Sequence, residues 1–203
     1  MNIKNILAGA VVAACSVGSA LAADAIPYPT PGTVNPATYS FTASTDGDIT
    51  AYFMGTSASY NETLGLLING VDSGITGLPN HGAGTTVGSS LDFGAVHQGD
   101  ILTFYIAVQT TGATWYSDKS LNADQSNHVY STAYTGGVTG VPAGTYVAFE
   151  DLPASNSNFN YFDETFVFTN VSTTPAVPEP GSIAMLLAGL GVMGVVARRR
   201  RSV

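Results

Sequence analysis

The residues best suited to chemistry lie in one loop, between Phe149 and the strand-like run Thr165-Phe166-Val167-Phe168. Carboxylate and amide side chains are concentrated there. They are Glu150, Asp151, Asn158, Asn160, Asp163 and Glu164. Ca²⁺ takes about 6 to 8 oxygen ligands from carboxylates, amide carbonyls and the backbone, and a loop that joins two strand ends can converge on one ion. The loop therefore predicts a calcium site.

Two other interpretations of this loop remain open from the sequence. Asn158 and Asn160 carry no negative charge, so the attraction for a hard cation could be weak. Asp and Asn side chains also bond to the backbone two residues further on, and an Asx-rich turn with a purely structural role would have the same composition.

The same carboxylates could serve as the acid and base of a glycan-acting hydrolase. Such a pair needs two carboxyl groups roughly 5 to 10 Å apart, one of them with a raised pKa. Neighbours such as Glu150 and Asp151 face opposite sides of an extended chain, so only Glu150 with Asp163 or Glu164 could pair. The chain has neither a Gly-x-Ser-x-Gly motif nor a phosphate-binding glycine loop. We expect no catalytic residues and no enzyme, and the hydrolase is a remote alternative.

Aromatic and histidine side chains are the remaining candidates. Trp115 and Tyr116, in a predicted loop, could stack on a sugar ring in a calcium-dependent, lectin-like module. His81, His97 and His128 lack the short spacing of zinc-binding histidines. The sugar-binding alternative therefore rests on Trp115 and Tyr116, and no metal or acid–base role is expected of the histidines.

The elements that must position these residues are strands. Gly and Pro recur every few residues between positions 24 and 177, and Thr, Val, Tyr and Phe dominate between them, which disfavours long helices. The predicted strands span residues 38–43, 49–54, 64–69, 90–93, 101–109, 128–134, 146–149 and 165–171. We therefore predict an all-β fold, a single β-sandwich or jelly-roll-like domain of about eight strands over residues 38–171. Residues 101–108 are apolar on both faces and should form a central strand.

Two segments precede this domain. Residues 1–22 contain Lys4, an apolar stretch and a small-residue site at Ala20-Leu21-Ala22, the pattern of a secretory signal peptide, and a signal helix is expected there. Cys15 lies inside it, so the exported domain would have no cysteine and no disulfide. Residues 23–37, with four prolines, predict an extended N-terminal spacer.

The segment after the domain has the pattern of a membrane anchor. Residues 172–182 form a predicted linker that ends in Val177, Pro178, Glu179, Pro180, Gly181 and Ser182. Residues 183–197 are apolar and predict a transmembrane helix of about 22 Å, short of a hydrocarbon core of ~30 Å. Residues 198–203 form a basic tail with four arginines, which should stay on the cytoplasmic side.

Pro-Glu-Pro before a glycine-bearing apolar helix and an arginine cluster resembles the PEP-CTERM sorting signal of Gram-negative bacteria. The resemblance covers Val177 to Arg201. It implies that a membrane-embedded exosortase recognises the motif at residues 177–182 and removes the tail, so that the inner membrane anchors the chain only transiently. The implied destination is the cell surface or the extracellular space.

Charge distinguishes the exported segment from its signals. All of the 14 acidic residues except Glu179 lie between Asp24 and Val177, where Lys119 is the one basic residue, and this segment has a formal charge of −12. Such a field repels nucleic acid and concentrates cations. We expect no nucleic-acid partner.

The acidic loop carries a second resemblance. Phe149-Glu150-Asp151-Leu152 and the run before the strand at Thr165 are similar to the end of an uncharacterised domain of bacterial surface proteins, written F-E-D-L and then D-x-D-[FY]-N-D. The resemblance implies a β-sandwich and a calcium site in that loop. Glu150, Asp151 and Asp163 match the acidic positions. The chain departs from the pattern at Asn158 and Asn160, where that family shows Asp, and at Phe162.

These observations favour a structural protein of the cell surface or of an extracellular, exopolysaccharide-rich biofilm matrix, with calcium as a stabilising ion. The alternative is the carbohydrate-binding module, for which exopolysaccharide would be the partner. The two differ in whether an exposed aromatic side chain is available for a sugar.

Overall fold

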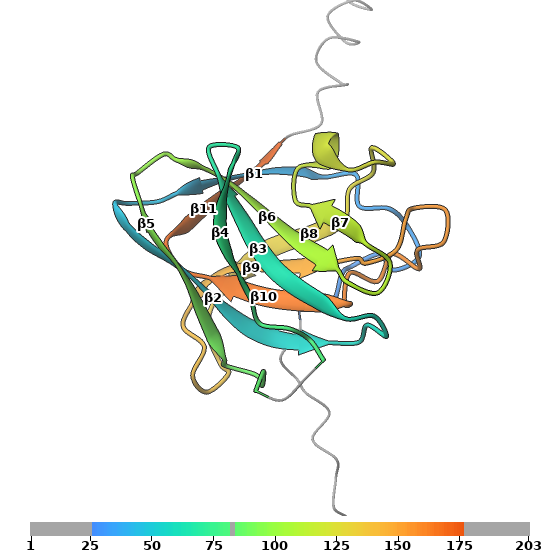
Figure 1. Cartoon of the computed structure of the whole chain (residues 1–203), viewed down its shortest axis with the longest axis horizontal. Coiled ribbons are helices and arrows are strands. Elements are labelled where there is room, and N and C mark those ends of the chain that lie inside the picture. Colours follow the sequence, from blue (N-terminus) through green and yellow to red (C-terminus); the bar gives the residue numbers. More distant parts are fainter. Residues whose placement is uncertain (1–25, 82–83, 177–203) are drawn as a thin grey trace, which may run out of the picture.

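Two antiparallel sheets make up the described part of the chain, residues 26–81 and 84–176 of the computed structural model (Figure 1). Sheet I has the order β11-β1-β6-β3-β4, with β7 also paired to β6. Its strands are β1 (Thr38–Ala43), β3 (Glu62–Ile68), β4 (Val71–Gly77), β6 (Ile101–Val108), β7 (Ala113–Tyr116) and β11 (Val171–Ala176). Sheet II has the order β5-β2-β10-β9-β8. Its strands are β2 (Gly47–Thr56), β5 (Ser90–Val96), β8 (Val129–Tyr134), β9 (Gly144–Phe149) and β10 (Glu164–Phe168).

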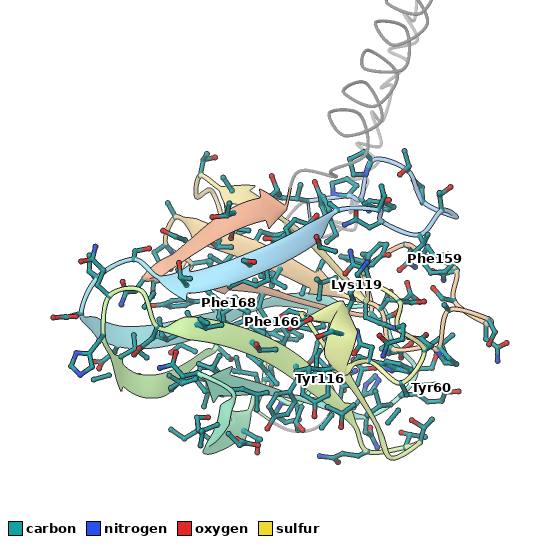
Figure 2. The ribbon with its side chains drawn as sticks, turned by 90° about the horizontal axis from the view of Figure 1, so that it is seen from above. Tyr60, Tyr116, Lys119, Phe159, Phe166 and Phe168 are labelled. Carbon is teal, nitrogen blue, oxygen red and sulfur yellow. The ribbon has the colours of Figure 1, made fainter. Side chains whose placement is uncertain are left out.

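The core lies between the inward faces of the two sheets. Alternate residues of a strand point to opposite faces, so Leu64 and Leu66 of β3 meet Phe166 and Phe168 of β10 in one cluster. The rings of Phe104 and Phe168 stack across the sheets with centroids 3.9 Å apart. Figure 2 shows Phe166 and Phe168 between the two layers. The β-sandwich architecture predicted from the sequence is thus supported.

Strand β6 lies in the interior of sheet I, as its apolar pattern predicted. Strand β6 pairs with β3 along one edge, and with β1 and then β7 along the other. Because both of its faces are covered, residues 102–106 are all buried.

Residues 23–37 were predicted to form an extended spacer, but the described part of this segment, residues 26–37, packs against the domain. Tyr28 is buried and packs edge-on against Tyr161, with centroids 4.8 Å apart, on the outer face of sheet II. Asn35 is also buried, and its backbone N–H donates to the Tyr161 hydroxyl at 2.9 Å. Apolar residues between the prolines therefore fix residues 26–37 to the domain.

The structure has eleven strands where eight were predicted. The eight predicted segments all become strands, and the additional ones are β4, β7 and β11. Strand β4 is an exposed, polar edge strand, so it lacks the hydrophobic alternation that marks the others. Strand β11 runs to Ala176 against β1, so the domain continues beyond the predicted boundary at residue 171 and the linker predicted from 172 starts as a strand.

Helix is limited to one short 3-10 element, η1 (Lys119–Leu121), in the part of the chain that the structure describes. No helix among these residues is long and apolar enough to cross a membrane. The predicted signal helix (1–22), transmembrane helix (183–197) and basic tail (198–203) lie outside the described residues.

Candidate metal centre

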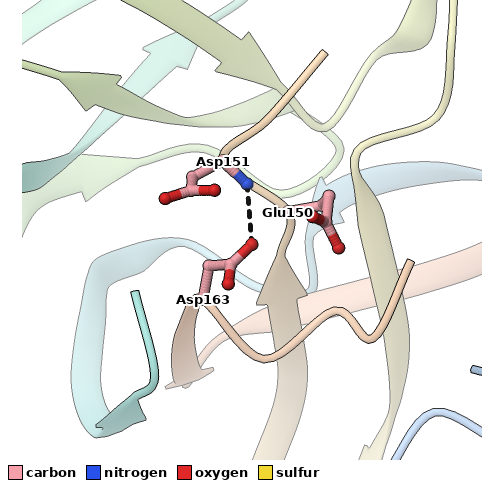
Figure 3. A group of neighbouring side chains, drawn as sticks. All are labelled: Glu150, Asp151 and Asp163. Atoms are coloured by element: carbon pink, nitrogen blue, oxygen red, sulfur yellow. Dashed lines mark hydrogen bonds between the residues drawn. The ribbon is translucent and has the colours of Figure 1, made fainter. Parts of the chain in front are cut away.

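The pairing of β9 with β10 brings the acidic loop residues together at one end of the sandwich. Glu164 pairs with Phe149 across the two strands, so the residues that follow β9 lie beside those that precede β10. The backbone N–H of Asp163 donates to the Phe149 carbonyl at 3.1 Å and closes the loop. Glu150, Asp151 and Asp163 consequently converge (Figure 3).

These three carboxylates have the geometry of a cation site. Each can place an oxygen within 4.8 Å of the others. The Asp151 backbone N–H donates to Asp163 Oδ2 at 3.0 Å, the dashed line in Figure 3. All three side chains are buried. Glu150 Oε1 has no hydrogen-bond partner in the structure.

The backbone carbonyls of the two leading acids are held in place by rings from elsewhere in the fold. Trp115 Nε1 donates to the Asp151 carbonyl at 2.6 Å. His128 Nδ1 lies 3.0 Å from the Glu150 carbonyl, and its Nε2 lies 3.1 Å from an Asp124 oxygen. Since both partners of His128 are acceptors, the two bonds form together when each ring nitrogen carries a hydrogen. Sequence reasoning assigned no role to His128, and the structure shows that it supports the acidic loop.

A cleft of about 300 Å³ gives solvent access to the site. Its walls come from the β2–β3 connection and the acidic loop. They consist of Ser57, Ala58, Ser59, Tyr60, Asp151, Leu152, Asn158 and Asp163. Two of the three clustered carboxylates therefore face a channel through which an ion could enter.

Burial of several like charges makes the metal-free cluster electrostatically unfavourable. Burial, and then the neighbouring Glu150 carboxylate, raise the pKa of Asp163 to about 8. Burial also raises the pKa of Glu150. Lys119, the one lysine or arginine in the described part of the chain, is exposed on η1 and makes no ion pair with the carboxylates. A divalent cation is the compensating charge that the donor set fits, since all of its donors are hard oxygens.

The remaining predicted ligands take different positions. Asn158 lines the cleft, but its Oδ1 accepts the Asn160 N–H at 2.9 Å, and Asn160 Oδ1 accepts the Phe162 N–H at 2.9 Å. These two Asx turns enclose Phe159 and Tyr161, whose φ angles of 49° and 51° lie in the left-handed region, which is uncommon for bulky residues. Asn160 lines a separate cleft beside the N-terminal segment. The asparagines thus shape the loop, and the structure does not bring Asn160 to the carboxylates.

Glu164 points into the sandwich, where it meets a residue that the sequence analysis did not consider. Glu62, the first residue of β3, is completely buried, as is Glu164. Burial, the approach of the Asp151 side chain and the charge of Glu164 raise the pKa of Glu62 to about 10. The sequence did contain a signal for this position. Glu62 alternates along the strand with the core residues Leu64 and Leu66, so it lies on the same face as they do.

Trp115 and Tyr116, the candidates for sugar stacking, do not lie in the loop that was predicted for them. Trp115 and Tyr116 lie in strand β7 and not in a loop. The Trp115 side chain is 5 % exposed and belongs to the core, and Tyr116 is half-buried against Tyr105. Trp115 therefore offers no free face to a sugar ring.

The comparison with known families identifies the C-terminal end. Residues 176–201 match the PEP-CTERM protein-sorting motif. No curated protein matches the chain. The PEP-CTERM motif implies an exported protein that an exosortase processes, with transient membrane sorting before release to the cell surface. The motif residues 177–182 lie outside the described residues, immediately after β11.

Proposed function

We propose that this PEP-CTERM protein is a non-enzymatic structural component of the cell surface or extracellular matrix, and that its β-sandwich is stabilised by Ca²⁺. The observation that carries the proposal is the convergence of Glu150, Asp151 and Asp163 within 4.8 Å, buried and without a compensating basic side chain in the cluster. Asn158 at the cleft wall, backbone carbonyls and water would supply the further oxygens that Ca²⁺ requires.

Calcium is favoured over other divalent ions by chemistry and by location. Zn²⁺ sites in proteins use mainly Cys and His, whereas this cluster offers carboxylate oxygens alone. Mg²⁺ demands a nearly ideal octahedral shell and retains its water, while Ca²⁺ accepts irregular sets of carboxylates. Extracellular modules bind Ca²⁺ with Kd values of about 10⁻⁴ to 10⁻³ M, which suits a protein exported beyond the inner membrane.

Two alternatives receive less support. A lectin-like module would need the aromatic face that Trp115 does not expose. A glycan-acting hydrolase would need two carboxylates across an open cleft that admits a sugar. The three clustered carboxylates lie close together and buried, and the cleft beside them holds only about 300 Å³. This arrangement suits an ion better than a glycan.

Thermal unfolding of the full-length chain tests the calcium proposal. A ligand that binds only the folded state adds about 2.7 kcal/mol at a concentration 100 times its Kd, which corresponds to roughly 5 °C or more here. We expect calcium to raise Tm by more than sodium chloride does at matched ionic strength. Asp163→Asn and Asp151→Asn should lose the calcium-specific part, and Asp48→Asn, an exposed position on β2, should retain it. Equal shifts from calcium and sodium chloride in the native sequence would refute the proposal.

A further inference from the structure

Two buried glutamates face each other across the sandwich beside the cation site. Glu62 opens β3 of sheet I on the face that carries Leu64 and Leu66. Glu164 opens β10 of sheet II on the face that carries Phe166 and Phe168. The side chains of both glutamates are 0 % exposed. Two acids from opposite sheets thus enter the same end of the core.

These glutamates lack any partner that could offset their burial. None of the four carboxylate oxygens of Glu62 and Glu164 makes a hydrogen bond in the structure. Glu62 comes within hydrogen-bonding reach of Asp151, but two carboxylates have no hydrogen to share unless one of them is protonated. A buried, unpaired carboxylate is strongly unfavourable, so these groups must either hold protons or share a positive charge between them.

Asp151 links these glutamates to the site described above. It follows Glu150 on the opposite face of the chain, so its carboxylate turns toward the interior and approaches Glu62, while its backbone N–H donates to Asp163. The charge of Asp151 also acts on Glu164. Five acids therefore form one continuous group with Asp151 in its middle. With all five carboxyl groups ionised, one divalent ion would leave three negative charges uncompensated.

We propose that Glu62 and Glu164 form a second, inner divalent-cation position, which shares Asp151 with the outer position at Glu150 and Asp163. The pair of ions would tie sheet I to sheet II at this end of the sandwich, because Glu62 belongs to one sheet and Glu164 to the other. The β2–β3 connection provides the route, since Ser57 to Tyr60 line the cleft and Glu62 follows two residues later. This inference rests on the proposed function, because Asp151 serves both positions.

Counting bound ions by native mass spectrometry of the full-length chain in detergent, with calcium chloride as the probe, tests the inner position. We expect two calcium ions on the native sequence and on the control Asp48→Asn. Glu62→Gln and Glu164→Gln should each bind one. One ion on the native sequence, unchanged by Glu62→Gln, would overturn the inner position and leave the proposed function intact. No bound ion would overturn both.

Thermal unfolding of the glutamine variants provides a second readout that does not depend on ion counting. In a chelator at neutral pH, Glu62→Gln should change Tm little, because the pKa of Glu62 is raised to about 10 and a neutral amide replaces a neutral acid of nearly the same shape. The rise on adding calcium should be smaller than in the native sequence. A lower Tm in chelator together with an undiminished calcium shift would contradict the proposal, since Glu62 would then be an ordinary core residue.

Discussion

The indole of Trp115 stacks on the imidazole of His128, with ring centroids 3.9 Å apart and planes 10° apart. The two rings come from β7 of sheet I and from the residue before β8 of sheet II. Each also bonds the backbone carbonyl of one acid, Trp115 that of Asp151 and His128 that of Glu150. The stack therefore fixes the start of the acidic loop against both sheets.

Replacement of Trp115 by Phe should destabilise the domain and weaken the cation site. Phe keeps an aromatic ring in the core but leaves the buried Asp151 carbonyl without its donor, which costs about 1–3 kcal/mol. Urea unfolding would measure the loss, with Tyr116→Phe, on the opposite face of β7, as the control expected to change little. Equal effects of the two substitutions would count against a supporting role for the stack.

The sandwich core should depend on the contact between Phe104 and Phe168. Phe168→Ala removes a buried ring that stacks across the sheets and leaves a cavity, for which a loss of about 3–5 kcal/mol is expected. Val71→Ala, at a side chain that is 70 % exposed on edge strand β4, should stay within about 0.5 kcal/mol. Denaturant unfolding of both variants checks the difference. A small effect at Phe168 would argue against the face-to-face packing of the sheets.

The metal-free domain should become less stable as pH rises. Carboxyl groups in unfolded chains have pKa values of about 4, whereas in the folded domain the pKa of Asp163 is raised to about 8 and that of Glu62 to about 10. A raised folded pKa gives stability that is complete below the unfolded pKa and is lost as pH rises through the folded pKa.

In a chelator, we therefore expect Tm to fall between about pH 5 and pH 8. Added calcium should reduce the fall, because a divalent cation takes over the role of the protons. A Tm in chelator that stays level or rises over this interval would show that these carboxylates are not buried as a group.

Sorting should require the PEP-CTERM motif itself. Strand β11 ends at Ala176, so cleavage near Pro180 leaves the described strands complete. In a host with an exosortase, the mature chain should end near Pro180, and alanine at Pro178, Glu179 and Pro180 should keep the protein in the inner membrane. Intact mass and membrane fractionation measure the two outcomes. A mature protein that retains residues 183–203 would contradict this expectation.

The fold was predictable where burial imposes a pattern. Strand β6 is apolar on both faces because sheet neighbours and the opposing sheet cover it, and its central position followed from that. Strand β4 was missed. Asn69 and Gly70, with φ angles of 51° and 80°, form the tight connection, but the strand beyond is exposed and contains little hydrophobic alternation.

The clustering of the acidic loop was predictable because its carboxylates are close in sequence. The position of Glu62 was not, because its neighbours in the fold are distant in sequence. Glu150, Asp151 and Asp163 lie within one loop, so their types and spacing indicated a common site. Glu62 reaches Asp151 only through the packing of sheet I on sheet II. Local pattern carries no information on such a contact. Similarly, Trp115 was assigned to a loop because β7 is only four residues long.

Protease treatment of intact cells in an exosortase-containing host tests most directly whether calcium stabilises this domain at the cell surface. In millimolar calcium, an external protease should leave the domain intact, and after a calcium chelator is added the domain should be degraded, because unfolded chains are the better substrates. The Asp163→Asn variant should be degraded in both conditions. Equal resistance with calcium and with chelator, or degradation only after cell lysis, would contradict the account.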